Sequence, residues 1–122
     1  MTCLMIGRYE HVVIDCPDPR ALASFYMQLL GMQVEREDDE WVVIRDGADR
    51  HRVAFQRVPD FREPQWPHPE RPQQFHIDVM VEDIEQAEAE ALKIGASRLP
   101  HQGPDYRVYA DPVGHPFCLC WA

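Results

Sequence analysis

Residues 11–32 read HVVIDCPDPRALASFYMQLLGM, and residues 76–96 read HIDVMVEDIEQAEAEALKIGA. Each stretch begins with a histidine, passes through a short apolar run, and reaches an aspartate seven residues later, at Asp18 and Asp83. Each then continues as a helical pattern that runs to a glycine. Such similarity between the two halves of one chain predicts a duplicated structural module.

Both predicted helices carry capping signals and apolar stripes. Asp18 can cap the first helix, with Pro19 in its first turn, and Asp83 opens a capping-box pattern before the second. Gly31 and Gly95 stand where a left-handed residue would close each helix. Apolar side chains recur at helical spacing at Leu22, Phe25, Tyr26, Leu29 and Leu30, and again at Ile84, Ala87, Ala91 and Ile94.

Three strand-like runs follow each helix, so each half reads strand, helix and then three strands. The runs are residues 32–37, 41–45 and 52–58 in the first half, and 97–100, 106–110 and 116–121 in the second. The last two strands of the second half are joined by DPVG at 111–114, which is typical of a turn. Period-two alternation should place Phe117 and Leu119 on the face opposite Cys118.

These patterns predict an α+β fold made of two βαβββ modules within a single domain, residues 1–122. The modules are expected at residues 8–58 and 74–122. Between them, residues 59–73 form a proline-rich connector that should be extended, because proline donates no backbone hydrogen bond. The connector is either a plain linker or a flap that lays Trp66 over a ligand cleft.

Composition narrows the possible functions. With 122 residues, of which 45% are hydrophobic, the chain can bury one core. The net charge of −9 argues against a nucleic-acid partner and admits a cationic ligand. No apolar run approaches membrane-spanning length, and the opening MTCLMIG does not resemble a signal peptide. We therefore expect a cytoplasmic protein with four free thiols and no membrane partner.

Two histidine-headed βαβββ modules resemble the vicinal oxygen chelate superfamily, which contains glyoxalase I, extradiol dioxygenases, and fosfomycin- and bleomycin-resistance proteins. The resemblance covers nearly the whole chain and is most specific at residues 18–32, DPRALASFYMQLLGM, and 111–119, DPVGHPFCL. It is closest to small bacterial glyoxalase-like domains. The resemblance implies an open, cup-shaped mixed β-sheet that holds a divalent metal ion through four positions, two in each module.

Those four metal positions fall on His11 and Gln56 in the first module and on His76 and Cys118 in the second. The chain thus keeps both imidazoles and lacks both carboxylates. Because Gln56 is neutral and cannot act as a general base, ordinary glyoxalase I activity is not expected. A Cys118 thiolate would favour zinc, with iron, nickel and manganese as the other candidates.

A carboxylate near the second histidine keeps metal chemistry open. His76 and Asp78 are two residues apart on a predicted strand and therefore share a face. Asp78 could bind a metal ion, orient His76, or act as a catalytic base; alternatively, the two side chains are simply hydrogen-bonded wall residues. Arg107 and Tyr109 either face the cup as ligand contacts or lie outside it in salt bridges.

Two functions of different classes remain open at this point. One is a metal-assisted lyase, isomerase or oxygenase acting on a small oxygen-bearing or aromatic molecule. The other is a non-catalytic protein of the bleomycin-resistance type, which sequesters a cationic aromatic compound by stacking on tryptophan. A homodimer is expected because each sheet has surfaces to cover, and the cup forms either within one chain or across the dimer.

Overall fold

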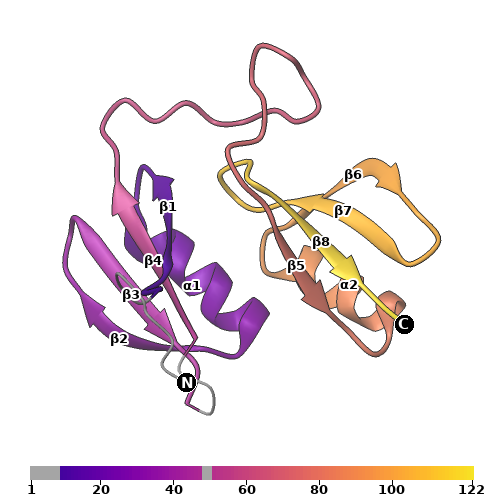
Figure 1. The fold of residues 1–122 in the computed structure, drawn as a ribbon, viewed down its shortest axis with the longest axis horizontal. Helices are drawn as coiled ribbons and strands as arrows, with labels where there is room; N and C mark the ends of the chain where they lie inside the picture. The colour runs from indigo at the N-terminus through magenta and orange to yellow at the C-terminus, as the bar shows by residue number, and fades with distance from the viewer. Residues whose placement is uncertain (1–8, 48–50) are drawn as a thin grey trace, which may run out of the picture.

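Each half of the chain forms a βαβββ module in the computed structural model, which describes residues 9–47 and 51–122 (Figure 1). The first module consists of β1 (Val12–Cys16), α1 (Pro19–Leu30), β2 (Gln33–Glu37), β3 (Trp41–Arg45) and β4 (Arg52–Arg57). The second consists of β5 (Ile77–Met80), α2 (Ile84–Lys93), β6 (Ser97–Gln102), β7 (Tyr106–Ala110) and β8 (Pro116–Cys120). Residues 58–76, all of which are described, contain no helix or strand.

The two modules have the same topology. Sheet A has the strand order β1-β4-β3-β2, and sheet B has the order β5-β8-β7-β6. In each sheet the first strand runs parallel to the last, and the other pairs are antiparallel. His11 and His76 each directly precede the first strand of their module. The α+β fold of two repeated modules is therefore confirmed.

Helix α1 begins and ends where the sequence predicts. The carboxylate of Asp18 accepts a hydrogen bond from the backbone N–H of Ala21 at 3.3 Å, and Pro19 is the first helical residue. Gly31 closes the helix in the left-handed conformation, with φ of 68°. This conformation is strained for any residue with a Cβ, which explains the glycine.

Helix α2 begins at its Asp83 cap and closes at Gly95, as the sequence predicts. Its last residue is Lys93, and beyond Ile94 the backbone N–H groups of Gly95 and Ala96 donate to the carbonyl oxygens of Leu92 and Ala91 at 3.2 and 3.0 Å, which is the hydrogen-bond pattern of a Schellman cap. Gly95 follows with φ of 117°, and a Cβ there would lie 3.2 Å from the Pro112 side chain. The positive φ of this helix cap and the close neighbour together favour glycine at this position.

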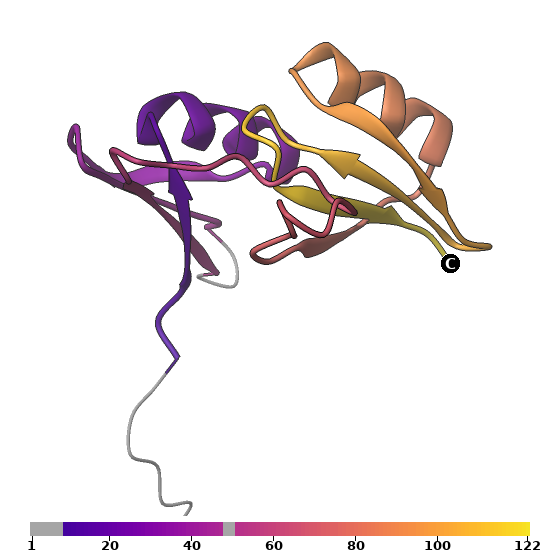
Figure 2. The ribbon, with the colours of Figure 1, turned by 90° about the horizontal axis from the view of Figure 1, so that it is seen from above.

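Both helices lie on the same side of the two sheets (Figure 2). Sheet A contributes the buried Ile14 and Phe55 to the core against the helices, and sheet B contributes Phe117 and Leu119. One continuous core therefore runs through both modules. The opposite face of each sheet, which carries no helix, is called its free face below. Within the described ranges, no helix is long and apolar enough to cross a membrane.

A buried polar junction joins the two modules. The hydroxyl of Tyr26, on α1, donates a hydrogen bond to Asp111 Oδ2 at 2.6 Å. Asp111 Oδ1 accepts the backbone N–H groups of Val113 and His115 at 2.9 and 3.0 Å. His115 Nε2 lies 2.8 Å from the carbonyl oxygen of Asp15, on β1. The turn before β8 is thereby tied both to the helix and to the first strand of the other module.

The predicted turn at residues 111–114 is confirmed. The Gly114 N–H donates to the Asp111 carbonyl at 3.0 Å, and Gly114 has φ of 93°. An added Cβ at Gly114 would collide with Glu63 and with the Pro64 backbone. Phe117 is fully buried while Cys118 faces the other side of the strand, as alternation predicts.

The junction yields a stability prediction. Tyr26→Phe should lower the free energy of unfolding by about 1–3 kcal/mol, because one oxygen of a buried carboxyl group loses its donor. Chemical denaturation monitored by circular dichroism measures the change. The matched control is Tyr106→Phe, at a ring that is 38% exposed, with an expected change within about 0.5 kcal/mol. Equal effects of the two substitutions would show that the Asp111 contact contributes no net stability.

Candidate functional site

The free face of sheet B forms a cavity of about 790 Å³. Its floor consists of residues from β5, β7 and β8, and one wall comes from β6. The connector supplies Trp66 and Gln73. No described residue of the first module lines this cavity, so the candidate site belongs to the second module and the connector alone.

The lining of the cavity is acidic. Asp78 and Asp105 contribute carboxylates, and His76 and His101 contribute imidazoles. Among the described residues that line it, none is a lysine or an arginine. A cavity of this composition favours a neutral or cationic guest over an anion.

One end of the cavity is aromatic. The rings of Trp66 and His101 lie 4.7 Å apart between centroids, at 55°. Nδ1 of His101 is buried and has no hydrogen-bond partner within the described part of the chain. Tyr106 lines the same cavity. Trp66 therefore lies at the cavity, where it offers a stacking surface beside an unused polar atom.

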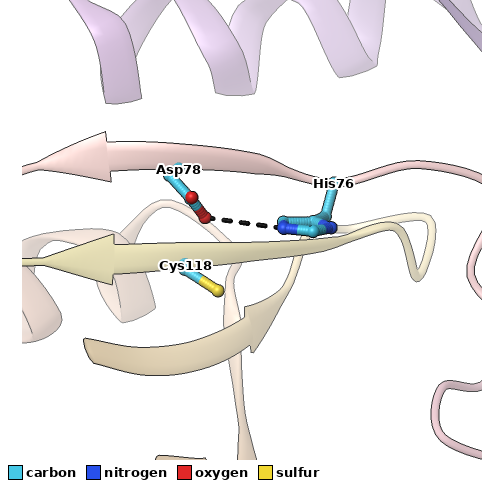
Figure 3. Close-up of side chains that lie close together, drawn as sticks. All are labelled: His76, Asp78 and Cys118. Atoms are coloured by element: carbon cyan, nitrogen blue, oxygen red, sulfur yellow. Dashed lines mark ion pairs between the residues drawn. The ribbon is translucent and has the colours of Figure 1, made fainter. Parts of the chain in front are cut away.

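The other candidate feature is a cluster of three side chains, His76, Asp78 and Cys118 (Figure 3). Asp78 on β5 and Cys118 on β8 are direct neighbours across the parallel strand pair, and His76 directly precedes β5. His76 Nε2 lies 3.6 Å from Asp78 Oδ1. The ligand atoms of all three lie within 4.8 Å of one another. An imidazole, a carboxylate and a thiol thus converge at one point.

The thiol in this cluster is protonated at neutral pH. Burial, and secondarily the Asp78 carboxylate, raises the pKa of Cys118 to about 11. Burial also raises the pKa of Cys120, which lines the same cavity. Cys16, Cys118 and Cys120 are free thiols, and Cys3 lies outside the described residues. Unassisted nucleophilic catalysis by these cysteines is therefore disfavoured, because the thiolate is the reactive form.

The four positions taken from the family resemblance do not meet within one chain. Cys118 lies beside His76, but not beside His11 and Gln56 as expected. The ring of His11 pairs with Trp41 at 5.9 Å, and Gln56 is the strand neighbour of Trp41, so both lie on sheet A. The two sheets are separate, and the cavity that contains His76 and Cys118 is lined by no described residue of sheet A. Within a single chain, these residues do not fit the family's metal site.

Arg107 and Tyr109 lie outside the cavity, which is the second of the two arrangements that the sequence left open, and they are therefore not ligand contacts there. Arg107 pairs with Glu85 at 3.0 Å, and the Tyr109 hydroxyl donates a hydrogen bond to Glu88 at 2.8 Å. Both glutamates lie on α2. The physical reason is strand alternation: on β7, Tyr106 and Val108 take the free face, so Arg107 and Tyr109 face the helix.

Sequence reasoning missed several cavity residues. Tyr106 could have been found, because it lies opposite Cys120 on β8 and two residues from Val108 on β7, so it shares the face of Cys118 and Cys120. His101 could not, because a register irregularity in β6 between Arg98 and Gln102 breaks the alternation that would have placed it.

Comparisons with known proteins agree with this architecture. The bleomycin-binding protein of Streptomyces verticillus, solved with copper(II)-bleomycin, shares 18% identity at a TM-score of 0.60, covering 97% of this chain and 99% of that one. A glyoxalase/bleomycin resistance protein/dioxygenase family enzyme from Burkholderia phytofirmans shares 18% identity at 0.70, covering 91% and 95%. A fosfomycin resistance protein from Mesorhizobium loti shares 15% identity at 0.69, covering 95% and 92%.

These structures place the chain in the glyoxalase/bleomycin-resistance fold class. The model of the glyoxalase-like domain family matches residues 11–120. The chain therefore belongs to the glyoxalase-like domain family. A search among curated proteins found no match.

The raised thiol pKa yields a pH-dependent prediction. Modification of Cys118 by iodoacetamide should be slow at neutral pH, and its rate should rise tenfold per pH unit until it levels off near the pKa of about 11. Peptide mass spectrometry quantifies the modified fraction, with Cys118→Ser identifying the peptide. N-acetylcysteine in the same buffers serves as the reference thiol. A rate that levels off near the ordinary thiol value of about 8.5 would contradict the prediction.

Proposed function

We propose that this protein binds a cationic, planar aromatic small molecule in the cavity of sheet B and does not transform it. The observation that carries the proposal is the composition of the cavity: Asp78 and Asp105 without a lysine or arginine among the described lining residues, next to Trp66 and Tyr106. Aromatic faces attract cations through their quadrupole, and the exposed carboxylates of Asp78 and Asp105 add to that attraction.

Two further observations support a binding function. The net charge of −9 favours cations over anions well beyond the cavity itself. The Streptomyces verticillus protein, which has a similar fold, is a bleomycin-binding protein. Gln56 offers no base at the family's carboxylate position, and it lies on sheet A, away from the cavity.

A second candidate function is a metal-assisted lyase, isomerase or oxygenase. It is favoured by the pair of His76 and Asp78, whose Nε2 and Oδ1 atoms lie 3.6 Å apart in the cavity. In this case Asp78 is the catalytic base and His76 positions it or binds the metal ion. The substrate would be a small oxygen-bearing molecule, and ordinary glyoxalase I activity is not expected.

Ligand preference tests the binding proposal. Calorimetric titration should show that proflavine, a planar aromatic cation, binds more tightly than anthracene-2-carboxylate, an anion of similar size. Trp66→Leu should weaken proflavine binding about 5- to 30-fold, equivalent to about 1–2 kcal/mol of cation–π attraction. Trp121→Leu, at a tryptophan that does not line the cavity, is the matched control and should change the affinity little.

Tighter binding of the anion, or equal losses in the two tryptophan variants, would contradict the proposed binding mode. Bound ligand should be recovered unchanged after prolonged incubation. Conversion of the ligand that Asp78→Asn abolishes would instead support the enzyme.

We also propose that the protein is a homodimer in which the free face of sheet A covers the free face of sheet B of a second copy. Apolar side chains are exposed on both free faces: Val13 is 38% exposed and Met80 is 71% exposed. A two-fold axis would make two such contacts at once. His11 and Gln56 of one copy would then approach the cavity of the other.

Light scattering at micromolar concentration should therefore give the mass of a dimer. Val13→Glu and Met80→Glu should each shift the protein towards the monomer, because they bury a charge in the contact. Leu92→Glu is the control, since Leu92 is 43% exposed on α2, away from both free faces. A monomeric wild-type protein, or equal dissociation by Leu92→Glu, would refute this arrangement.

A further inference from the structure

We propose that His76, Asp78 and Cys118 together bind one divalent metal ion, with a preference for zinc, inside a single module of a single chain. This site differs from the four positions of the family resemblance, because it omits His11 and Gln56 and recruits Asp78. It shares the cavity of the proposed function but does not depend on the aromatic ligand.

The spacing of the donor atoms suits a tetrahedral ion. Nitrogen and oxygen ligands of zinc at about 2.0–2.2 Å, and sulfur at about 2.3 Å, lie about 3.3–3.6 Å from one another in a tetrahedron. His76 Nε2 and Asp78 Oδ1 are already 3.6 Å apart, and all three donors lie within 4.8 Å. The His76 and Asp78 side chains are 47% and 63% exposed, so small rotations can close the remaining gap.

The position of the cluster in the fold is also favourable. Asp78 and Cys118 are fixed opposite each other by the parallel pairing of β5, an edge strand of sheet B, with the central strand β8. Phe117 and Leu119 anchor β8 in the core on either side of Cys118. Two of the three donors are therefore held by sheet register rather than by a loop.

The donor set selects the class of ion. An imidazole, a carboxylate and a thiolate match the ligands that zinc accepts, whereas magnesium and calcium prefer oxygen alone. A divalent ion balances the charges of Asp78 and a Cys118 thiolate, which leaves Asp105 as the carboxylate for a cationic ligand. Three protein ligands also leave one tetrahedral position for a water molecule or a ligand atom.

Cobalt(II) is the probe, because its binding to a thiolate gives a charge-transfer absorption band. Chelator-treated protein titrated with cobalt(II) should bind one ion per chain, show this band, and release the cobalt to zinc. Cys118→Ser should abolish the band, whereas Cys120→Ser should keep it, although both thiols line the same cavity.

The cavity supplies matched controls for the other two ligands as well. His76→Ala and Asp78→Asn should each weaken cobalt binding at least tenfold, since even loss of a group that only supports a ligand costs about 10- to 100-fold. His101→Ala and Asp105→Asn, in the same cavity, should change it by less than about threefold. Circular dichroism verifies that each variant is folded.

Two further variants distinguish a metal site within one chain from a metal site shared between two copies of the chain. His11→Ala should leave cobalt binding unchanged, and so should the monomeric Val13→Glu. Loss of binding in either variant, a band that survives in Cys118→Ser, or equal effects within each matched pair would overturn the inference. Proflavine binding without any cobalt binding would overturn the metal site and leave the proposed function standing.

Discussion

The hydrogen bond from the Tyr26 hydroxyl to Asp111 Oδ2 fixes how the two modules sit against each other. It joins α1 to the turn before β8, and the same carboxylate also closes that turn. Burial raises the pKa of both Tyr26 and Asp111, which is the cost of placing these polar groups inside the core. That cost is offset because both oxygens of Asp111 find donors.

The junction gives the duplicated modules unequal roles. The free faces of sheets A and B stay separate from each other. His11 and His76, which begin the two modules, therefore have different surroundings. His11 lies against Trp41, with 5.9 Å between the ring centroids. His76 instead faces an open cavity. Equivalent positions of the two modules thus hold a ring contact in the first module and a candidate ligand in the second.

The connector adds to this difference because it is anchored to the second module. Phe61 and Phe75, near its two ends, both pack against the buried ring of His115, at 5.5 and 4.9 Å between centroids. Between these anchors lies Trp66, which lines the cavity of sheet B. The cavity, its acidic lining and its aromatic wall consequently all belong to the second module and the connector, and they favour cations of either kind, organic or metallic.

The sequence by itself determined the modules, because capping residues, helical stripes and strand alternation are local signals that each repeat carries twice. It also determined that Cys118 and Asp78 face away from the core, since alternation follows from strand geometry alone. Only the tertiary structure decided which candidates meet. His11 and Gln56 are separated from His76 and Cys118 by the orientation of the modules, which depends on long-range contacts such as Tyr26 with Asp111 and His115 with Asp15. His101 reaches the cavity through an irregularity in strand pairing that involves two segments at once, so neither segment predicts it alone.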